Sequence, residues 1–230
     1  MFSQHLKFMK NIPYFFSLLL GFNTIFPQQF NQLADAVIEK DTSKIEQLLQ
    51  SGVDINTQHP TSGTTVLMIA SSYYYYDDMV EFLIKKGVNV NLKDSEGKTA
   101  LLWAASNSLP NAKILVANGA KVNEPANDGM TPFIQATLGF SSGKVPIEMS
   151  ELLRKNGAKV NAELKRKSAL GWTALHYAVT NGDAELVKYL IKHGANVNKS
   201  TGEGSSPLFL AKLGGYDDIV KILKNAGAKE

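Results

Sequence analysis

The sequence predicts an all-α fold: a helical repeat solenoid of about six stacked helix-turn-helix units joined by hairpin loops. Two phrases recur in register, and copies of the first are roughly 35 residues apart, a period typical of helical repeat arrays. The first phrase reads GVDIN at Gly52, GVNVN at Gly87, GAKVN at Gly119, GAKVN at Gly157 and GANVN at Gly194. The second reads TVLMIA at Thr65, TALLWAA at Thr99, TPFIQA at Thr131, TALHYA at Thr173 and SPLFLA at Ser206.

The glycine phrase predicts helix ends. Each copy follows an apolar pattern with helical spacing, and the residue after a helix often turns left-handed, where a Cβ is penalised. The Val or Ile three residues after the glycine is expected to point into a core. The Asn that follows is expected to start the next turn.

The threonine phrase predicts helix starts. A Thr or Ser can cap the helix that begins just after it, and Pro132 and Pro207 occupy the first helical position, where no amide donor is needed. The threonine phrase therefore opens helices, and the glycine phrase closes them.

The block GWTALHYAVTNGDAELVKYLIKHGANVN, Gly171 to Asn198, resembles the ankyrin repeat family, and the resemblance extends over roughly residues 31–230. It implies a hairpin loop and two antiparallel helices per unit. It also implies a function: proteins similar to this one bind other proteins, through side chains that vary between units.

The repeat domain is predicted over residues 29–230, with units near 31–57, 58–91, 92–123, 124–161, 162–198 and 199–230. The first unit lacks the threonine phrase, as an end unit can, and Asp41 to Ser43 are expected to form its turn. Insertions are expected around 140–146 and after Asn161, where loops extend at little cost. The last unit is expected to end in a polar helix, because nothing stacks beyond it.

Composition excludes several functions. The chain has no cysteine, which removes disulfides, thiolate metal sites and a cysteine nucleophile. A formal charge of +3 gives little attraction to nucleic acid. No histidine pair or phosphate loop is present, so no metal, cofactor or enzymatic activity is predicted. The expected partner is another protein, and a monomer is expected.

Residues 1–28 form a signal-like or anchoring apolar N-terminal segment. A basic lead with Lys7 and Lys10 precedes an apolar run from Ile12 to Phe26, which is shorter than the roughly 20 residues of a membrane-spanning helix. This layout favours an export signal, although no A-x-A-like cleavage site follows. The alternatives are an uncleaved anchor and a helix that covers the end of the stack.

Export would make the protein secreted or periplasmic, and the alternative localisation is cytoplasmic. The corresponding alternative function is an exported effector or a periplasmic protective protein that acts through ankyrin-mediated binding, with no stable membrane insertion after signal removal. N-terminal sequencing separates these alternatives: a chain that starts near residues 22–28 supports export, and one that starts at Met1 does not.

Several motifs have structural interpretations. His176 is expected to link hairpins by hydrogen bonds. The pairs Asp77-Asp78 and Asp217-Asp218 are expected at the starts of helices, near the positive end of the helix dipole. The basic cluster Lys165 to Lys167 is interpreted as a solvated loop.

Residues Tyr73 to Tyr76 are expected at the turn between two helices, with at least two of the four rings partly exposed. This unit has one residue more than the family spacing, whereas Ala112 in the next unit suggests a lighter core. The resemblance places partner contacts on a concave face of hairpin tips and first helices. The partner-binding residues it implies are Tyr73, Tyr74, Lys98, Asn107, Met130, Trp172 and Asn181.

Overall fold

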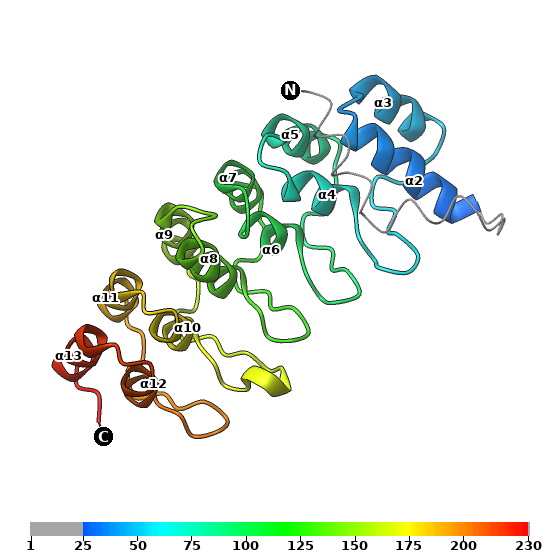
Figure 1. Cartoon of the computed structure of the whole chain (residues 1–230). Helices are drawn as coiled ribbons and strands as arrows, with labels where there is room; N and C mark the ends of the chain where they lie inside the picture. The colour runs from blue at the N-terminus through cyan, green and yellow to red at the C-terminus, as the bar shows by residue number, and fades with distance from the viewer. Residues whose placement is uncertain (1–24, 230) are drawn as a thin grey trace, which may run out of the picture.

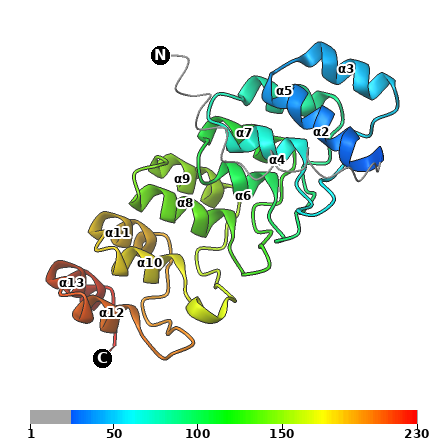
Figure 2. The same cartoon turned by 45° about the vertical axis from the view of Figure 1, so that its right-hand side comes forward.

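The computed structural model describes residues 25–229, and this part of the chain is a stack of paired helices without a β-strand. Two layers of antiparallel helices run along the stack, and the long loops between pairs extend from the same side (Figures 1 and 2). The predicted all-α solenoid is therefore confirmed.

The twelve α-helices of residues 25–229 alternate between the two layers. The first helices of the pairs are α2 (Ile25–Ile38), α4 (Val66–Ser72), α6 (Ala100–Ala104), α8 (Pro132–Ser141), α10 (Ala174–Thr180) and α12 (Pro207–Leu213). The second helices are α3 (Thr42–Gln50), α5 (Asp77–Lys85), α7 (Leu109–Ala117), α9 (Ile147–Lys155), α11 (Ala184–Lys192) and α13 (Asp217–Asn225).

The helix starts confirm the predicted role of the threonine phrase. The side-chain oxygens of Thr65, Thr99, Thr131 and Ser206 each accept a hydrogen bond from the backbone amide three residues further on. Each bond satisfies an amide that has no partner within its own helix. Pro132 and Pro207 begin their helices, as predicted.

The glycines that close the units are left-handed, as predicted. Gly194 has φ +88° and follows α11, and the amide of Ala195 donates to the carbonyl of Leu190 at 2.9 Å. The equivalent glycines of the other units adopt φ between +84° and +94°. The left-handed conformation turns the backbone toward the next hairpin, and it is unfavourable for any residue that has a Cβ.

An asparagine ladder, formed by Asn91, Asn123, Asn161 and Asn198, joins the ends of successive units. The Nδ2 atom of each donates to the carbonyl of the closing glycine in the next unit, at 2.8 to 3.1 Å. The Oδ1 atom accepts the amide two residues after that glycine, at 2.8 or 2.9 Å. The sequence pattern predicted these residues only at turns, whereas the structure shows that they connect units.

The first unit differs from its prediction. Helix α2 begins at Ile25, inside the segment predicted to be signal-like, and residues 1–24 of that segment lie outside the described residues. The predicted turn from Asp41 to Ser43 is wrong by two residues: Asp41 caps α3 and Thr42 and Ser43 belong to it. The physical reason is the cap, since the Asp41 side chain accepts the amide of Lys44 at 2.9 Å.

Both insertions lie where they were expected. The one between α8 and α9 packs its Val145 side chain, 4% exposed, so close to Gly139 that a Cβ there would lie 2.5 Å from Val145 Cγ2. The insertion after Asn161 contains a short 3-10 helix, η3 (Lys167–Ala169). Within residues 25–229 no helix is both long and apolar enough to cross a membrane.

Gly194→Val is expected to be more damaging than Lys192→Ala. A Cβ at Gly194 would meet no atom within 4 Å, so the cost comes from the left-handed backbone alone and exceeds about 1 kcal/mol. Lys192 is an exposed residue of α11 and serves as the control. Urea denaturation measures both variants, and equal midpoints would show that the backbone conformation of Gly194 carries no such cost.

Candidate functional site

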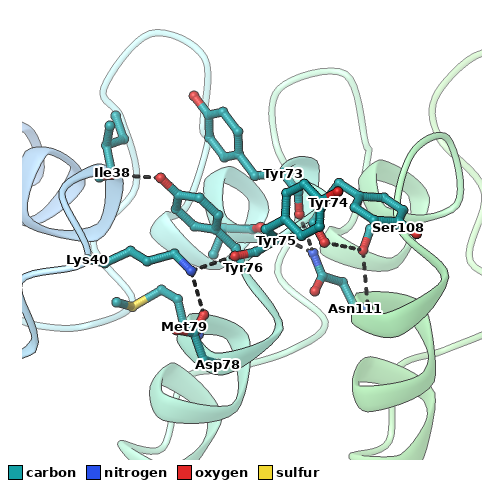
Figure 3. Close-up of polar contacts among 11 residues, drawn as sticks. Ile38, Lys40, Tyr73, Tyr74, Tyr75, Tyr76, Asp78, Met79, Ser108 and Asn111 are labelled. Atoms are coloured by element: carbon teal, nitrogen blue, oxygen red, sulfur yellow. Dashed lines mark hydrogen bonds and ion pairs between the residues drawn. The ribbon is translucent and has the colours of Figure 1, made fainter. Parts of the chain in front are cut away.

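The turn between α4 and α5 presents the four consecutive tyrosines as two pairs (Figure 3). Tyr73 and Tyr76 are partly buried and stack with ring centroids 4.7 Å apart. Tyr74 and Tyr75 are 53% and 76% exposed and meet edge to face at 4.8 Å. The expectation that at least two rings remain exposed is confirmed. An exposed aromatic pair that its own neighbours hold in place is suited to recognition.

The first unit holds this turn from one side. The Tyr76 hydroxyl donates to the carbonyl of Ile38 at 2.7 Å, and burial raises the pKa of Tyr76. Lys40 Nζ lies 4.5 Å from the centroid of the Tyr76 ring and donates to the carbonyl of Tyr75 and to Asp78 Oδ1, the latter at 2.8 Å. The hydrogen bond from Lys40 lowers the pKa of Asp78.

Lys40 reaches these groups from a left-handed backbone, with φ 56°. The corresponding turns before α11 and α13 have glycine there, Gly182 and Gly215, with φ 68° and 71°. A side chain in this conformation costs roughly 1–2 kcal/mol. Lys40 therefore occupies a position where glycine would avoid backbone strain. This indicates that the contacts of Lys40 with the tyrosine turn, residues 73–76, offset the cost of its left-handed backbone.

Asn111 holds the turn from the other side. It is fully buried in α7, and its Nδ2 atom lies 2.8 Å from the carbonyl oxygen of Tyr73, 3.3 Å from that of Ser71 and 3.4 Å from that of Ala70. The same position is apolar in the other second helices that follow the threonine phrase, with Met79, Met149, Leu186 and Ile219. The Asn111 amide therefore provides a donor for the carbonyls at the end of α4. The unit that contains α4 has one residue more than the family spacing at this turn.

Ala112 of this helix was singled out from the sequence and Asn111 was not, although a polar residue in an apolar position beside a longer unit was a readable signal. Two weaker contacts support the same turn. Asn107 Nδ2 lies 3.4 Å from the carbonyl of Ser72, and Ser108 Oγ lies 3.5 Å from that of Tyr74. The exposed side chain of Asn107 thus lies beside the tyrosine turn, as its predicted role requires.

Trp172 and Lys98 belong to a different part of the surface, at the foot of the hairpins. Trp172 is partly buried, and its ring centroid lies 5.0 Å from that of Tyr177. Lys98 forms an ion pair with Glu96, and its Nζ lies 5.4 Å from the centroid of the Trp103 ring. Both predicted residues therefore lie beside aromatic side chains of first helices.

Met130 does not lie on the surface that the resemblance implied. It is 8% exposed and packs in a small apolar cluster with Leu102, Ile134 and Leu164. The insertion after Asn161 explains this correction, because it contributes Leu164, 1% exposed, to the same cluster. Asn181 is exposed at the end of α10, in the unit after the inserted hairpin.

The seven predicted residues therefore fall into separate groups. Tyr73, Tyr74 and Asn107 meet at one turn, Lys98 and Trp172 lie at hairpins, Asn181 lies at the turn of a later unit, and Met130 is buried. A stripe of partly exposed side chains, which was not predicted from the sequence, lies at the fourth position of the first helices: Ile69, Trp103, Gln135, Tyr177 and Leu210. Their differing types at one position of a repeated phrase were the available signal.

The inserted hairpin is held against its own unit. Arg166 donates to the Tyr177 hydroxyl at 2.6 Å and lies 3.8 Å from Asp128 Oδ2. The basic cluster is thus partly engaged within the protein.

A groove of about 520 Å³ lies between this hairpin and the next one, with Leu170, Lys165 and Lys199 among its lining residues. Leu170 is 53% exposed.

His176 has the structural role predicted for it. Its Nδ1 atom accepts the amide of Thr173 at 3.1 Å, and its Nε2 atom lies 3.0 Å from the carbonyl oxygen of Lys199 in the next hairpin. The first contact leaves Nε2 to carry the proton and donate. Burial lowers the pKa of His176, so the neutral ring is favoured. Residues 25–229 contain no cluster of three or more potential metal ligands.

The comparisons with known proteins agree with this geometry. A family model described as ankyrin repeats matches residues 33–126 and 141–230. The chain belongs to the ankyrin repeat family. Ankyrin repeats generally act as modules for binding other proteins and are typically not enzymes.

Individual relatives share the repeats within proteins of different lengths. The chain is 32% identical over 209 residues to mouse Rabankyrin-5, and this match covers 84% of the chain and 17% of Rabankyrin-5. It is 34% identical over 170 residues to human neurogenic locus notch homolog protein 1, covering 73% of the chain and 6% of that protein. A putative ankyrin repeat protein from Escherichia coli, YahD, is 29% identical over 202 residues, covering 84% of the chain and 94% of YahD.

Replacement of the buried amide tests the support of the tyrosine turn. Asn111→Leu introduces the residue found at the equivalent position of α11, Leu186, but removes the donor to the carbonyls at the end of α4. We expect a loss of about 1–3 kcal/mol in the free energy of unfolding. Asn107→Ala, which removes only a 3.4 Å contact of an exposed side chain, is the control. An Asn111→Leu variant as stable as the wild type would show that the amide does not support the turn.

The pH dependence of stability tests the burial of His176. In the unfolded chain His176 takes up a proton as the pH falls through about 6.5, whereas the folded state resists protonation. Its stabilising contribution is therefore complete above pH 6.5 and is lost as the pH falls below that value. The difference in unfolding free energy between wild type and His176→Gln should narrow from pH 7.5 to pH 5, measured in urea. Burial also lowers the pKa of His59, but His59 is present in both proteins, so its contribution cancels from the difference in unfolding free energy. A constant difference would contradict the assignment.

Proposed function

We propose that the chain is a non-enzymatic scaffold that captures a partner protein on the surface of its hairpins, the open sides of its first helices and the α4–α5 turn. One observation carries the proposal: the outward tyrosine pair, Tyr74 and Tyr75, is exposed on a turn that Lys40 and Asn111 fix from both sides. A side chain that is already ordered loses little conformational entropy on binding. Such a pair is therefore an efficient anchor for a partner.

The stripe on the first helices supports the same surface. Trp103 and Tyr177 lie in the two units that also carry Lys98 and Trp172, and both aromatic side chains are partly exposed at the foot of a hairpin. Aromatic residues are enriched in binding hot spots because they combine large contact area with a polar group. A partner that reaches from the tyrosine turn to the fifth unit would contact several of them.

Export, with secreted or periplasmic localisation, rests on residues 1–28 alone and does not alter this proposal. The binding surface as proposed uses only residues that the structure describes. N-terminal sequencing therefore addresses localisation separately from binding.

Binding by surface variants tests the proposal. Tyr74→Ala and Trp172→Ala are each expected to weaken binding of the native partner at least tenfold, since truncation of an aromatic anchor typically costs about 2 kcal/mol or more. Lys188 is an exposed residue of α11, in the layer of second helices, and Lys188→Ala should change affinity little. The partner is captured from an extract of the source cells on the immobilised chain, identified, purified and titrated against each variant.

Circular dichroism first establishes that each variant is folded. This control matters for Trp172, which is partly buried. The reverse ranking, with Lys188→Ala impaired and both aromatic variants binding normally, would move the binding surface to the layer of second helices.

A further inference from the structure

A backbone hydrogen bond that recurs along the stack joins neighbouring hairpins. The amide of Ser95 donates to the carbonyl of Ser62 at 2.8 Å. In the next hairpin the amide of Asn127 donates to the carbonyl of Glu96, also at 2.8 Å. Ser95 and Glu96 are consecutive residues, so this hairpin contacts both of its neighbours through two adjacent positions.

The inserted hairpin, residues 162–171, separates these two contacts. The amide of Lys165 donates to the carbonyl of Asp128 in the preceding hairpin at 2.7 Å. The carbonyl of Leu170 accepts the amide of Gly202 in the last hairpin, residues 199–205, at 2.6 Å. The segment between the two contacts, residues 166–169, includes η3. The inserted hairpin, yellow in Figures 1 and 2, is therefore longer than the others but is fixed to both neighbours by backbone hydrogen bonds.

The groove between the inserted hairpin and the last hairpin is formed by these fixed segments. Its lining includes Lys165 and Leu170 on one side and Lys199 and Gly202 on the other. Gly202 is not left-handed, and a Cβ there would lie 2.9 Å from Leu170 Cγ, so the missing side chain is what lets Leu170 lie against the last hairpin. The groove volume of about 520 Å³ falls within the roughly 300–1,000 Å³ of ligand-binding clefts.

Leu170 occupies a hairpin position that is polar in the other units. The residue before the left-handed glycine of each other hairpin is Ser62, Glu96, Asp128 or Glu203. Leu170 is 53% exposed. An exposed leucine is common by itself. Here, however, it replaces a polar residue at a repeated position and also lines a groove, which indicates an apolar contact with a ligand.

The groove carries an excess of positive charge. The charged residues in its lining are Glu163, Lys165 and Lys199, which are two ammonium groups and one carboxylate. Glu163 pairs with Lys199 at 2.8 Å. Within residues 25–229 the side chain of Lys165 forms no hydrogen bond or ion pair, so Lys165 carries the uncompensated charge. Lys167 and Glu203, which flank the groove in sequence, have opposite charges and leave the excess unchanged.

We propose that the groove binds an acidic segment of the partner protein, in which carboxylates flank an aliphatic side chain. The aliphatic side chain packs on Leu170, and a carboxylate approaches Lys165. This proposal rests on the proposed function, since it assumes a partner protein along the hairpins, and it specifies the chemistry of one segment of that partner. A nucleic acid fits less well, because such interfaces pair several phosphates with Lys or Arg, whereas this groove has a single cation in excess.

The test uses the full chain and short labelled peptides that carry either Glu or Lys on both sides of a central leucine, with binding measured by fluorescence anisotropy. The Glu peptide should bind roughly tenfold more tightly than the Lys peptide, and added salt should weaken it. Lys165→Glu and Leu170→Ser should each weaken the Glu peptide roughly fivefold. Both residues are exposed, so folding is expected to survive, and circular dichroism verifies it.

A third peptide tests the apolar contact by itself. It keeps the flanking Glu residues and has serine in place of the central leucine. This peptide should bind more weakly to the wild type, and Leu170→Ser should not weaken it further, because the contact that Leu170 makes is already absent. Equal losses for both Glu peptides on Leu170→Ser would overturn the assignment of the leucine to Leu170.

Three control variants should bind the Glu peptide as the wild type does. Lys188→Glu makes the same change of charge as Lys165→Glu, on an exposed residue of α11. Phe209→Ser removes an apolar side chain of α12 that is as exposed as Leu170, 53%. Tyr74→Ala alters the tyrosine turn. Loss of peptide binding in any of these variants would overturn the assignment to the groove.

The remaining outcomes separate this proposal from the proposed function. Equal affinity for the Glu and Lys peptides, full binding by Lys165→Glu, or no binding of the Glu peptide at millimolar concentration would overturn the groove proposal alone. Binding of a single-stranded oligonucleotide but not of the Glu peptide would overturn it in favour of a nucleic acid. If the peptides behave as expected while Tyr74→Ala and Trp172→Ala capture the native partner normally, the groove is supported and the surface proposed above is contradicted.

Discussion

The structure depends on the contact between neighbouring units, because no single pair of short helices buries its apolar side chains alone. The third residue of the first helix is buried in each unit from the second to the fifth: Met68, Leu102, Ile134 and His176 are between 0% and 4% exposed. The next hairpin contributes to this burial, since Leu102 and Ile134 pack with Met130 and Leu164, and His176 contacts the carbonyl of Lys199. The asparagine ladder also joins neighbouring units, through hydrogen bonds to the glycine that closes the next unit. Asn123, Asn161 and Asn198 are exposed and Asn91 is partly exposed. Each hydrogen bond therefore contributes about 1 kcal/mol or less, and the ladder serves mainly to set the spacing of successive units.

This constraint leaves only certain positions free for function. Residues that contact the neighbouring unit must keep their size and polarity, and any departure among them requires compensation nearby. Asn111 is such a case: its amide replaces an apolar side chain and bonds the carbonyls that the longer turn leaves at the end of α4. Lys40 is another, since its left-handed backbone coincides with contacts to Tyr75, Tyr76 and Asp78. Both departures converge on the turn that exposes Tyr74 and Tyr75.

Local signals allowed much of the fold to be predicted from sequence. The caps at Thr65, Thr99 and Thr131 and the left-handed glycines depend on residues within a few positions, so the recurring phrases correctly placed the starts of the first helices that they precede and the ends of the second helices. What was missed depends on neighbours distant in sequence. Met130 is buried by Leu164 of the inserted hairpin, and Phe209 is exposed because no described residue covers it. The same limit applied to the candidate site, where the tyrosines were recognised but their supports, Lys40 and Asn111, were not.

The central claim is that the protein binds where its units differ and keeps its frame where they agree. Hydroxyl-radical footprinting of the chain, free and in complex with its purified native partner, tests this claim directly, because the oxidation of each side chain reports its own exposure. The account predicts protection of Tyr74, Tyr75 and Trp172, with the exposed residues of α9 and α11 oxidised equally in both states. Protection confined to α9 and α11, with the tyrosine pair still fully oxidised in the complex, would contradict it.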